Sequence, residues 1–530
     1  MLKKYSDLQE KQFLSQVYPE SQDLFLFVKA ASEDFVQLNK SLSKQFHCLF
    51  ESGTPSCDLS DYDGILLVNR DVELMDSTLS FFAAALKEGY DFIYSDAAFG
   101  GMAETQLLYP DTPFKNFKTD FALISGPLFQ RISKELKDPS VSDLLSYGFS
   151  ISEKPHHINQ ILLNYRMPLT ADALFLSGRK RALIFCHEFT LTGAPLVLKE
   201  SIEYLNDYQL FIMGPEMDTL TDAFLDKGIP VILDKNARKA SDITSLAFSC
   251  DLVLANTIIM YDVVNMLSGS NVPVLWWLHD NETCYCKDVY FLELASNIHI
   301  YCVSEYAQKC FLHYQPNAKT KLLPYVVKDF SNNSTANASF FPSSKGKVFF
   351  SSIGSINAVK GTDLFCDAIL KLPEKIRKQC VFYFAGNGND KKAFTRLMDL
   401  CERFPETVIY GGVIERDQIS SLYLQTDCVV CSSRYDPLPT FVTEGWMFAK
   451  PCLCSKNTGS AAFIKEGQNG YVFDPENTDE FVSFICKIVK EKPFRKEKVH
   501  LCCRNTYLEN FSPAVFQKHF LAAVEECMEE

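Results

Sequence analysis

Residues 428–444 read C-V-V-C-S-S-R-Y-D-P-L-P-T-F-V-T-E, and this stretch decides the fold. The apolar run Cys428–Cys431 predicts a short buried strand. A helix should follow with Pro439 as its first residue, because proline is well suited to that position. Asp436 then lies in the loop, and Glu444 lies about one turn inside the helix.

The expected helix start is suited to an anion. The backbone N–H groups of Thr440 and Phe441 would point out of the helix, with the positive end of the helix dipole behind them. Glu444 could reach the hydroxyls of a ribose. This arrangement suits a nucleotide-activated sugar. Two carboxylates at this spacing also occur on ordinary solvated surfaces. The motifs in the other segments must therefore decide whether this pair binds a ligand.

Composition excludes several classes of protein. A chain of 530 residues predicts about three domains, and 47% hydrophobic with 22% charged residues is typical of a globular protein. The formal net charge of −14 argues against a partner that is a nucleic acid polymer, since such binders need basic surface. A small phosphate ligand needs only local positive potential and is not excluded.

The termini and cysteines bear on location and metal. The first residues, M-L-K-K-Y-S-D-L-Q-E-K-Q, contain no apolar segment typical of a signal peptide, and no apolar run reaches membrane-spanning length. We therefore expect a cytoplasmic protein, with peripheral association at the inner face of the membrane left open. The 19 cysteines should then be reduced thiols. Cys428 and Cys431 lack a second pair at zinc spacing, so no metal site is expected.

Three blocks follow from the alternation of apolar runs and turns. Residues 1–175 are mixed α/β, whereas residues 180–340 and 346–530 each start a fresh α/β pattern, separated by the polar linker Ser331–Lys347. Strands are expected at Arg181–Cys186, Tyr208–Met213, Val231–Leu233, Asp251–Ala255, Val274–Leu278, His299–Val303, Val348–Ile353, Val381–Ala385, Val408–Tyr410, Cys428–Cys431 and Pro451–Cys454. This pattern predicts two parallel sheets covered by helices, with a ligand at the carboxyl ends of the strands.

Two strand ends of the second block carry polar groups. The first is followed by H-E-F-T-L-T-G-A-P from His187, in which Gly193 leaves room for the backbone and Thr192 could cap a helix near Pro195. Strand Val274–Leu278 ends in His279, which could donate a hydrogen bond to a sugar or phosphate oxygen. Alone, the first segment is more readily an ordinary strand–turn–helix. A lone histidine is also more often structural, but the place of His279 at the strand tip, with Asp280 beside it, favours a ligand contact.

The third block has two glycine turns after strands. In I-G-S-I-N-A-V-K-G, Gly354 and Ser355 follow a strand, and Lys360 stands where a helix opens, an arrangement suited to a diphosphate. The second turn is G-N-G, where Gly386 and Gly388 could allow the backbone to approach a nucleotide base or phosphate.

Taken in order, these motifs resemble the retaining glycosyltransferases of family four, which have the GT-B fold of two Rossmann-like domains. The resemblance covers about residues 181–490. It implies that Asp436, in place of the family's first Glu, contacts the donor sugar and that Glu444 contacts the ribose. It also implies that Lys360 binds phosphate and that His279 contacts the donor. The chain departs from the family at Ser355, Val359 and Ala462, where two basic residues and an acid are common.

The first block resembles a degenerate GT-A module of glycosyltransferase family two. D-G-I-L-L-V-N-R-D, residues 63–71, matches the strand before that family's metal-binding D-x-D, but the triplet is Asn69-Arg70-Asp71. D-F-I-Y-S-D, residues 91–96, and H-H-I-N-Q-I-L-L-N-Y-R, residues 156–166, match later elements. An arginine would compete with a metal ion. We expect a structural, acceptor or partner role for this block.

The sequence therefore predicts a retaining, metal-independent glycosyltransferase of hexosyltransferase type. It would use a nucleotide-diphosphate sugar as donor and need no cofactor. The acceptor would be a glycan, a lipid-linked molecule or a protein, with surface polysaccharide synthesis as the expected setting. The alternative is a catalytically weak GT-B-like partner or scaffold of a glycosylation complex. A nucleotide-dependent oxidoreductase fits poorly, because no strand is followed by G-x-G-x-x-G with an acid about 20 residues on.

Overall fold

The computed structural model describes residues 25–529 except for 33–34, 43–48, 53–57, 59–61, 76–77, 101–104, 111–117, 138, 166–168, 177, 286–293, 332–340, 342–345, 389 and 415. Most of the expected linker 331–347 and the N-terminal stretch lie outside the described residues. The chain divides into two compact units. The first contains residues 1–191, 205–254 and 270–272, and the second contains 192–204, 255–269 and 273–530. The bounds of the three expected domains stay predictions.

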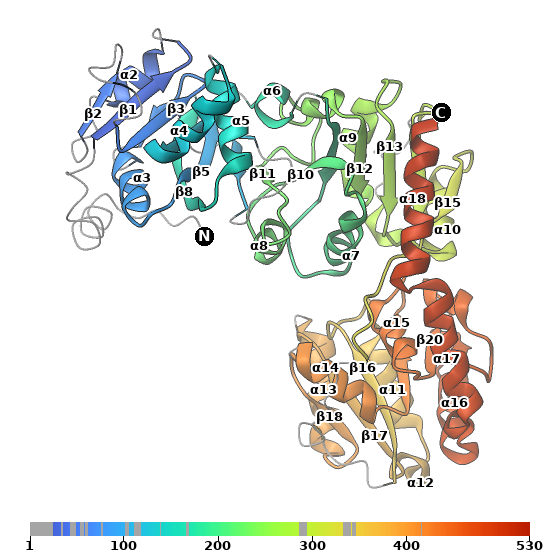
Figure 1. Cartoon of the computed structure of the whole chain (residues 1–530). Coiled ribbons are helices and arrows are strands. Elements are labelled where there is room, and N and C mark those ends of the chain that lie inside the picture. Colours follow the sequence, from blue (N-terminus) through green and yellow to red (C-terminus); the bar gives the residue numbers. More distant parts are fainter. Residues whose placement is uncertain are drawn as a thin grey trace. The chain divides into compact units, whose positions relative to one another are not determined.

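The first unit is built on one mixed sheet (Figure 1). Its strands lie in the order β2-β1-β3-β7-β5-β6-β11-β10-β9-β12, and β8 pairs with β4 and β5. The bounds are β1 (Phe25–Ala30), β2 (Leu49–Ser52), β3 (Gly64–Val68), β4 (Glu73–Leu74), β5 (Phe92–Phe99), β6 (Thr105–Leu108), β7 (Phe121–Ser125), β8 (Pro155–Tyr165), β9 (Lys180–Phe185), β10 (Tyr208–Gly214), β11 (Val231–Asp234) and β12 (Leu252–Asn256). The helices include α2 (Val36–Leu42), α3 (Thr78–Lys87), α4 (Gly126–Glu135), α5 (Val141–Ile151), α6 (Ala171–Leu174) and α8 (Thr219–Leu225).

One antiparallel pair continues the sheet of the first block into the second. Strand β6 pairs with β11, so that Leu108 lies opposite Val231 and Thr105 opposite Asp234. The Thr105 hydroxyl donates to Asp234 Oδ2 over 2.6 Å, and this bond is buried. The two blocks that the sequence predicts as separate therefore share backbone hydrogen bonds.

The second unit holds the rest of the parallel strands. Strands β13 (Val274–Leu278), β14 (Ile298–Cys302) and β15 (Thr320–Leu322) pair in parallel. A separate six-stranded sheet has the order β18-β17-β16-β19-β20-β21, and all its pairs are parallel. Its strands are β16 (Val348–Ile353), β17 (Cys380–Ala385), β18 (Val408–Tyr410), β19 (Cys428–Cys431), β20 (Cys452–Ser455) and β21 (Gly470–Phe473). Every strand predicted for the second and third blocks is confirmed to within one residue at each end.

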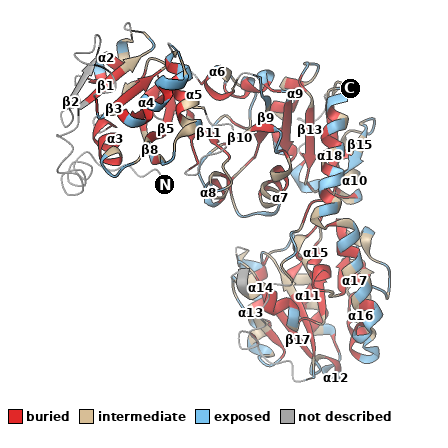
Figure 2. Cartoon of the chain, viewed as in Figure 1, coloured by how far each residue is buried: buried red, intermediate tan, exposed pale blue. Residues whose placement is uncertain are grey.

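Helices cover the six-stranded sheet, whose strands are almost wholly buried (Figure 2). These helices are α11 (Thr362–Lys371), α12 (Glu374–Arg377), α13 (Lys391–Arg403), α14 (Arg416–Gln425), α15 (Thr440–Met447), α16 (Thr478–Glu491) and α17 (Glu497–Asn510). Apolar strands buried on both faces are what a parallel sheet between helix layers requires.

The last helix, α18 (Pro513–Glu529), packs against β13 within the second unit. The Trp277 ring stacks on Phe516 with centroids 5.9 Å apart, and Tyr301 donates to Glu526 Oε2 over 3.0 Å. Helices α7 (Gly193–Ser201), α9 (Tyr261–Leu267) and α10 (Glu305–Tyr314) complete this part of the unit. The end of the chain thus packs against strands that lie more than 200 residues earlier in the sequence.

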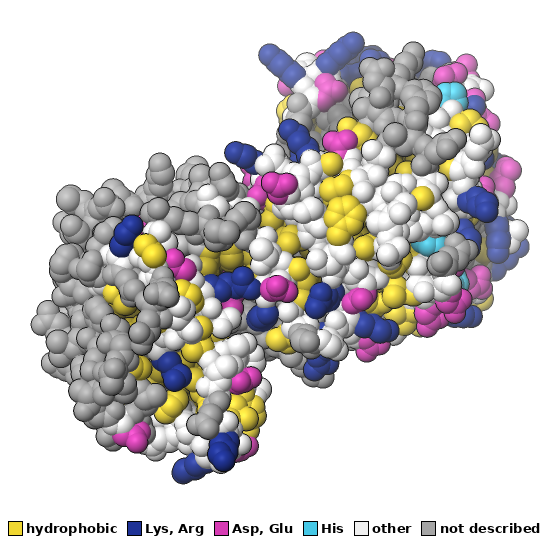
Figure 3. Space-filling model, turned by 90° about the horizontal axis from the view of Figure 1, so that it is seen from above, with side chains coloured by type: hydrophobic (Ala, Val, Ile, Leu, Met, Phe, Trp, Pro, Cys, Tyr) yellow, Lys and Arg dark blue, Asp and Glu magenta, His cyan; other side chains and the backbone are white. Residues whose placement is uncertain are grey.

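Among the described residues, no helix is long and apolar enough to cross a membrane. On the face seen in Figure 3, acidic and basic side chains are interspersed. The described residues of that face therefore form no continuous basic surface of the kind that binds a nucleic acid polymer.

Candidate functional site

The structure brings Asp436 and Lys360 into direct contact. Lys360 Nζ lies 2.6 Å from Asp436 Oδ2, and the two side chains are 36% and 6% exposed. Burial acts to lower the pKa of the Lys360 ammonium, but the Asp436 carboxylate outweighs it and holds that pKa above its ordinary value. Lys360 is therefore a charged group at the carboxyl ends of the strands, available to an anion on its exposed side.

The backbone of Asp436 is fixed by a neighbouring loop. Its N–H donates to Asn457 O over 3.2 Å, and its carbonyl accepts from the N–H of Gly459 over 3.0 Å. A Cβ at Gly459 would collide with Pro437 O, so the close contact between these two loops requires a glycine at this position. The loop of residues 457–462 thus holds the backbone of Asp436 in place.

The turn that carries Gly354, Ser355 and Lys360 follows β16. Gly354 has φ 137° and Gly361 has φ 66°, both in the region that favours glycine. A Cβ on Gly361 would lie 1.9 Å from Ser432 O, so this turn packs tightly against the loop after β19. At Gly354 a Cβ would meet nothing within 4 Å, which leaves open space beside this residue.

The second glycine turn has a packing explanation. A Cβ on Gly386 would lie 1.9 Å from Gly354 O, and one on Gly388 would lie 2.4 Å from the Phe394 ring. The missing side chains therefore make room for protein atoms. Contact of Gly386 and Gly388 with a nucleotide stays a prediction.

Helix α15 carries the other predicted donor contacts. It begins at Thr440, with Pro439 just before it as N-cap, one residue later than the sequence predicts. The first N–H groups of an α-helix have no partner inside the helix, and here they belong to Thr440 and Phe441. Glu444 lies one turn further on, and its Oε2 accepts a 2.8 Å hydrogen bond from the Tyr423 hydroxyl.

His279 lies at the end of β13, beside the buried Asp280. Asp280 Oδ2 accepts from the N–H of Ile258 over 2.7 Å and from that of His279 over 3.2 Å. Burial raises the pKa of Asp280 to about 7, although these N–H groups act in the opposite direction. The carboxyl group links the end of β13 to the turn after β12.

That turn contains a strained residue. Thr257 has φ 77° and ψ 166°, which is unfavourable for a β-branched side chain. Its N–H donates to Trp277 O and its carbonyl accepts from Trp276 Nε1, each over 2.8 Å. The sequence does not reveal this turn, because its conformation depends on the neighbouring strand.

Gly193 is the first residue of α7 and is exposed. Thr192 is the N-cap but makes no side-chain capping hydrogen bond, so the expected cap is wrong in that respect. Asn256 Nδ2 donates to Ala194 O over 3.2 Å and holds this loop at the end of β12. His187, in the first unit, is buried, and burial lowers its pKa to about 4.

The triplet that replaces D-x-D is occupied by structural contacts. Asn69 Nδ2 donates to Asp120 Oδ1 over 2.7 Å, and Arg70 Nε lies 2.5 Å from Asp120 Oδ2. The Asp71 carboxylate accepts from the backbone N–H groups of Gln37 and Leu38, at the start of α2. No cluster of three or more potential metal ligands is found among the described residues.

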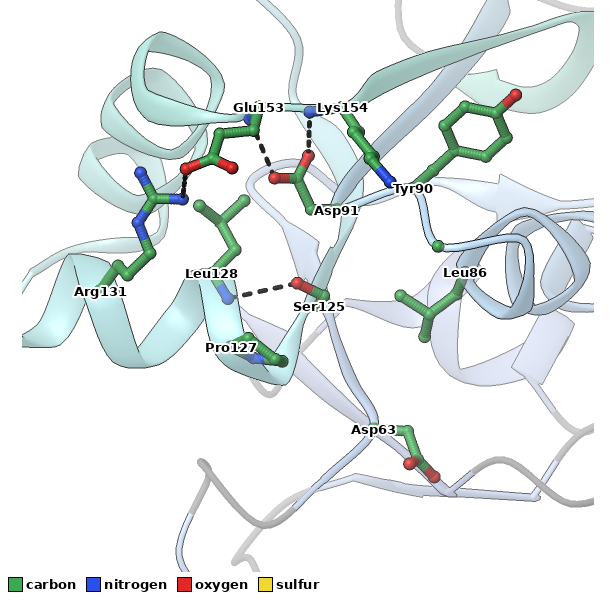
Figure 4. Close-up of a pocket in the computed structure, with 11 residues that line it drawn as sticks. Asp63, Leu86, Tyr90, Asp91, Ser125, Pro127, Leu128, Arg131, Glu153 and Lys154 are labelled. Atoms are coloured by element: carbon green, nitrogen blue, oxygen red, sulfur yellow. Dashed lines mark hydrogen bonds and ion pairs between the residues drawn. The ribbon is translucent and has the colours of Figure 1, made fainter.

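A pocket of about 460 Å³ lies elsewhere, in the first unit, next to the start of α4 (Figure 4). Asp91 accepts there from the N–H groups of Glu153 and Lys154, and Ser125 Oγ caps Leu128 N over 3.2 Å. These hydrogen bonds stabilise local turns of the backbone. None of the predicted site residues lines this pocket.

Sequence reasoning missed two residues that hold the turn after β16 and the start of α15 in place. Arg434 donates to both carboxylate oxygens of Asp363 over 2.7 Å, and its N–H donates to Val359 O over 2.8 Å. Arg434 stands inside the deciding stretch and could have been found there. Tyr423 resembles any core tyrosine in the sequence, so no local signal marks it.

Two family models match consecutive parts of the chain. Glycosyl-transferase family 4 matches residues 178–335, and Glycosyl transferases group 1 matches residues 334–500. Among curated proteins, the α-D-kanosaminyltransferase of Streptomyces kanamyceticus is 24% identical over 171 residues, covering 32% of this chain and 42% of the relative. The mannosylfructose-phosphate synthase of Agrobacterium fabrum is 25% identical over 162 residues, covering 29% and 34%. The chain thus spans less than half the length of these relatives.

Solved structures share the fold. Anabaena HepE in complex with UDP and glucose superposes with a TM-score of 0.56 at 16% identity, covering 66% of this chain and all of that one. The lipopolysaccharide outer core galactosyltransferase WaaB gives 0.52 at 15% identity, covering 66% and 99%. Residues 178–500 therefore match glycosyltransferase family models in two successive parts, and the structure shares the GT-B fold of solved glycosyltransferases.

Proposed function

We propose that this protein is a retaining, metal-independent glycosyltransferase that moves a sugar from a nucleoside diphosphate sugar to a glycan or glycoconjugate. The observation that carries the proposal is the Lys360–Asp436 contact of 2.6 Å, next to a helix start whose second turn presents Glu444. A cation and the amides at the helix start suit a diphosphate. The two carboxylates, held by different partners, suit a sugar and a ribose.

Each group would have a distinct role. Lys360 and the amides of Thr440 and Phe441 would bind the diphosphate and stabilise the negative charge that develops on it as the bond to the anomeric carbon breaks. Asp436 would contact the sugar and Glu444 the ribose hydroxyls. His279 would contact the sugar or a phosphate oxygen. Gly354 and Ser355 would line the diphosphate, where the structure leaves open space beside Gly354.

The donor base is proposed from the neighbours. HepE crystals contain UDP, glucose or UDP-glucose, so UDP is the first nucleotide to test here. As expected from the sequence, the acceptor would be a glycan, a lipid-linked molecule or a protein. Peripheral attachment to a membrane is left open.

Release of UDP from UDP-sugars, measured with and without EDTA, tests the metal-independent reaction. Proton NMR of the released or transferred sugar tests retention, because it distinguishes α from β anomers. We expect turnover that EDTA leaves unchanged and a product with the donor's configuration. Loss of turnover with EDTA or an inverted product would contradict the respective part of the proposal.

A second function is favoured by one observation. Val359 stands where the family commonly has a basic residue, and its side chain is 41% exposed in the phosphate turn. Together with Ser355, this leaves Lys360 as the cation of the turn, which favours weak donor binding and a partner or scaffold role. Measurable UDP binding without release or transfer of sugar above the uncatalysed rate would support this alternative.

A further inference from the structure

The second acid of the site is anchored by a residue from another helix. Tyr423 belongs to α14, and its hydroxyl lies 2.8 Å from Glu444 Oε2 and 2.9 Å from Phe441 O, both on α15. Its side chain is wholly buried, and its ring stacks on Phe448 with centroids 5.2 Å apart and planes at 20°. The hydroxyl therefore has a fixed position relative to α15.

Tyr423 can only act as a donor here. Burial holds its pKa well above the ordinary value, and the Glu444 carboxylate raises it further, so the phenol keeps its proton. That single proton lies between a carboxylate and a backbone carbonyl. A charged acceptor forms the stronger hydrogen bond.

Glu444 needs such an anchor to bind a ribose. It is half-buried, and a glutamate side chain has three torsions that would otherwise sample several rotamers. The Tyr423 hydroxyl holds Oε2 in place and so restricts the direction in which the Glu444 carboxylate lies. Pre-organised groups bind more tightly because less freedom is lost on binding.

We propose that Tyr423 is a positioning residue that orients the Glu444 carboxylate for the ribose of the donor. This inference rests on the proposed function, in which Glu444 contacts that ribose. A purely structural tyrosine would stabilise α15 without affecting how a nucleotide binds.

The test is a double-mutant cycle with UDP as the probe, measured by calorimetry on the full chain. Tyr423→Phe removes the hydroxyl and keeps the ring, and we expect UDP binding to weaken about tenfold. Glu444→Ala removes the anchored group, and in that background Tyr423→Phe should change the affinity less than about twofold. Melting curves establish that each variant is folded at the assay temperature.

Tyr507→Phe is the matched control. Tyr507 is also wholly buried, and its hydroxyl donates to Val327 O over 2.7 Å. Its loss should lower the melting temperature and leave UDP affinity within about twofold. With turnover, Tyr423→Phe should raise the donor KM and leave kcat within about twofold.

The outcomes separate the two claims. If Glu444→Ala weakens UDP binding but Tyr423→Phe does not, the positioning role is wrong and the proposed function stands. If Tyr423→Phe weakens UDP binding by the same factor in the wild type and in Glu444→Ala, the tyrosine acts by another route and the inference fails. If Glu444→Ala leaves UDP affinity unchanged, the ribose role in the proposed function fails, and the inference fails with it.

Discussion

Neutralising Asp436 should improve the binding of bare UDP while it slows sugar transfer. Asp436→Asn keeps the shape of the side chain but removes the charge that lies 2.6 Å from Lys360 Nζ. In the wild type, a diphosphate that contacts Lys360 must approach this carboxylate. In the variant, the burial that lowers the pKa of Lys360 is no longer opposed by the carboxylate, so the titration is run near pH 6, well below the ordinary lysine pKa of about 10.4.

The magnitude follows from Coulomb's law. A phosphate oxygen on the far side of the ammonium would lie about 6 Å from the carboxylate, where two unit charges repel by about 3 kcal/mol at an effective dielectric constant of about 20. The Lys360 side chain is 36% exposed, and solvent screening reduces this to about 1 kcal/mol. We therefore expect Asp436→Asn to bind UDP about fivefold more tightly.

The assay is calorimetric titration of UDP, paired with turnover of a UDP-sugar. Turnover should fall, because the variant loses a contact with the sugar that is stronger in the transition state. The control is Asp479→Asn, which removes one charge from the same sheet domain at a side chain that is 84% exposed. Weaker UDP binding in Asp436→Asn, or full turnover, would refute the reasoning.

Three further predictions concern the second acid, a buried carboxyl group and the shared sheet. Glu444→Gln should weaken UDP binding about tenfold in calorimetry, whereas the exposed Glu374→Gln should not; equal affinities would remove the ribose role. The raised pKa of Asp280, about 7, makes the native state bind more protons than the unfolded state, so its contribution to stability is lost as pH rises from about 4 to 7. The melting temperature of Asp280→Asn should then depend less on pH over this range than that of the wild type. Parallel plots of melting temperature against pH would contradict this prediction. A chain of residues 180–530 should melt cooperatively but at a lower temperature, since it loses the β6 partner of β11, and an insoluble product would contradict the expected boundary.

The parallel sheets could be predicted closely from the sequence. Strands such as β13, β16 and β19 are short apolar runs bounded by turn residues, and buried parallel strands require that composition. Gly354 and Gly386 were predictable for the same reason, because they follow directly after such strands, and Lys360 stands just before the helix that follows the first turn.

Contacts between distant segments could not be predicted. Lys360 and Asp436 are each predicted as ligand contacts, but their ion pair joins positions 76 residues apart. The β6–β11 pairing depends on a four-residue strand, paired with β5 on its other side, whose sequence has no distinctive pattern. Tyr423 and the strained Thr257 are set by neighbours that only the folded chain supplies.

The central claim is that this chain binds a nucleotide sugar through Lys360. The most direct measurement is a thermal-shift screen of the wild type and Lys360→Met against UDP-, GDP- and ADP-sugars. A ligand at about 100 times its Kd stabilises the native state by about 2.7 kcal/mol. We predict that at least one nucleotide sugar raises the wild-type melting temperature and that Lys360→Met, itself folded, loses this shift. No shift with any donor, or an equal shift in the variant, would contradict the account.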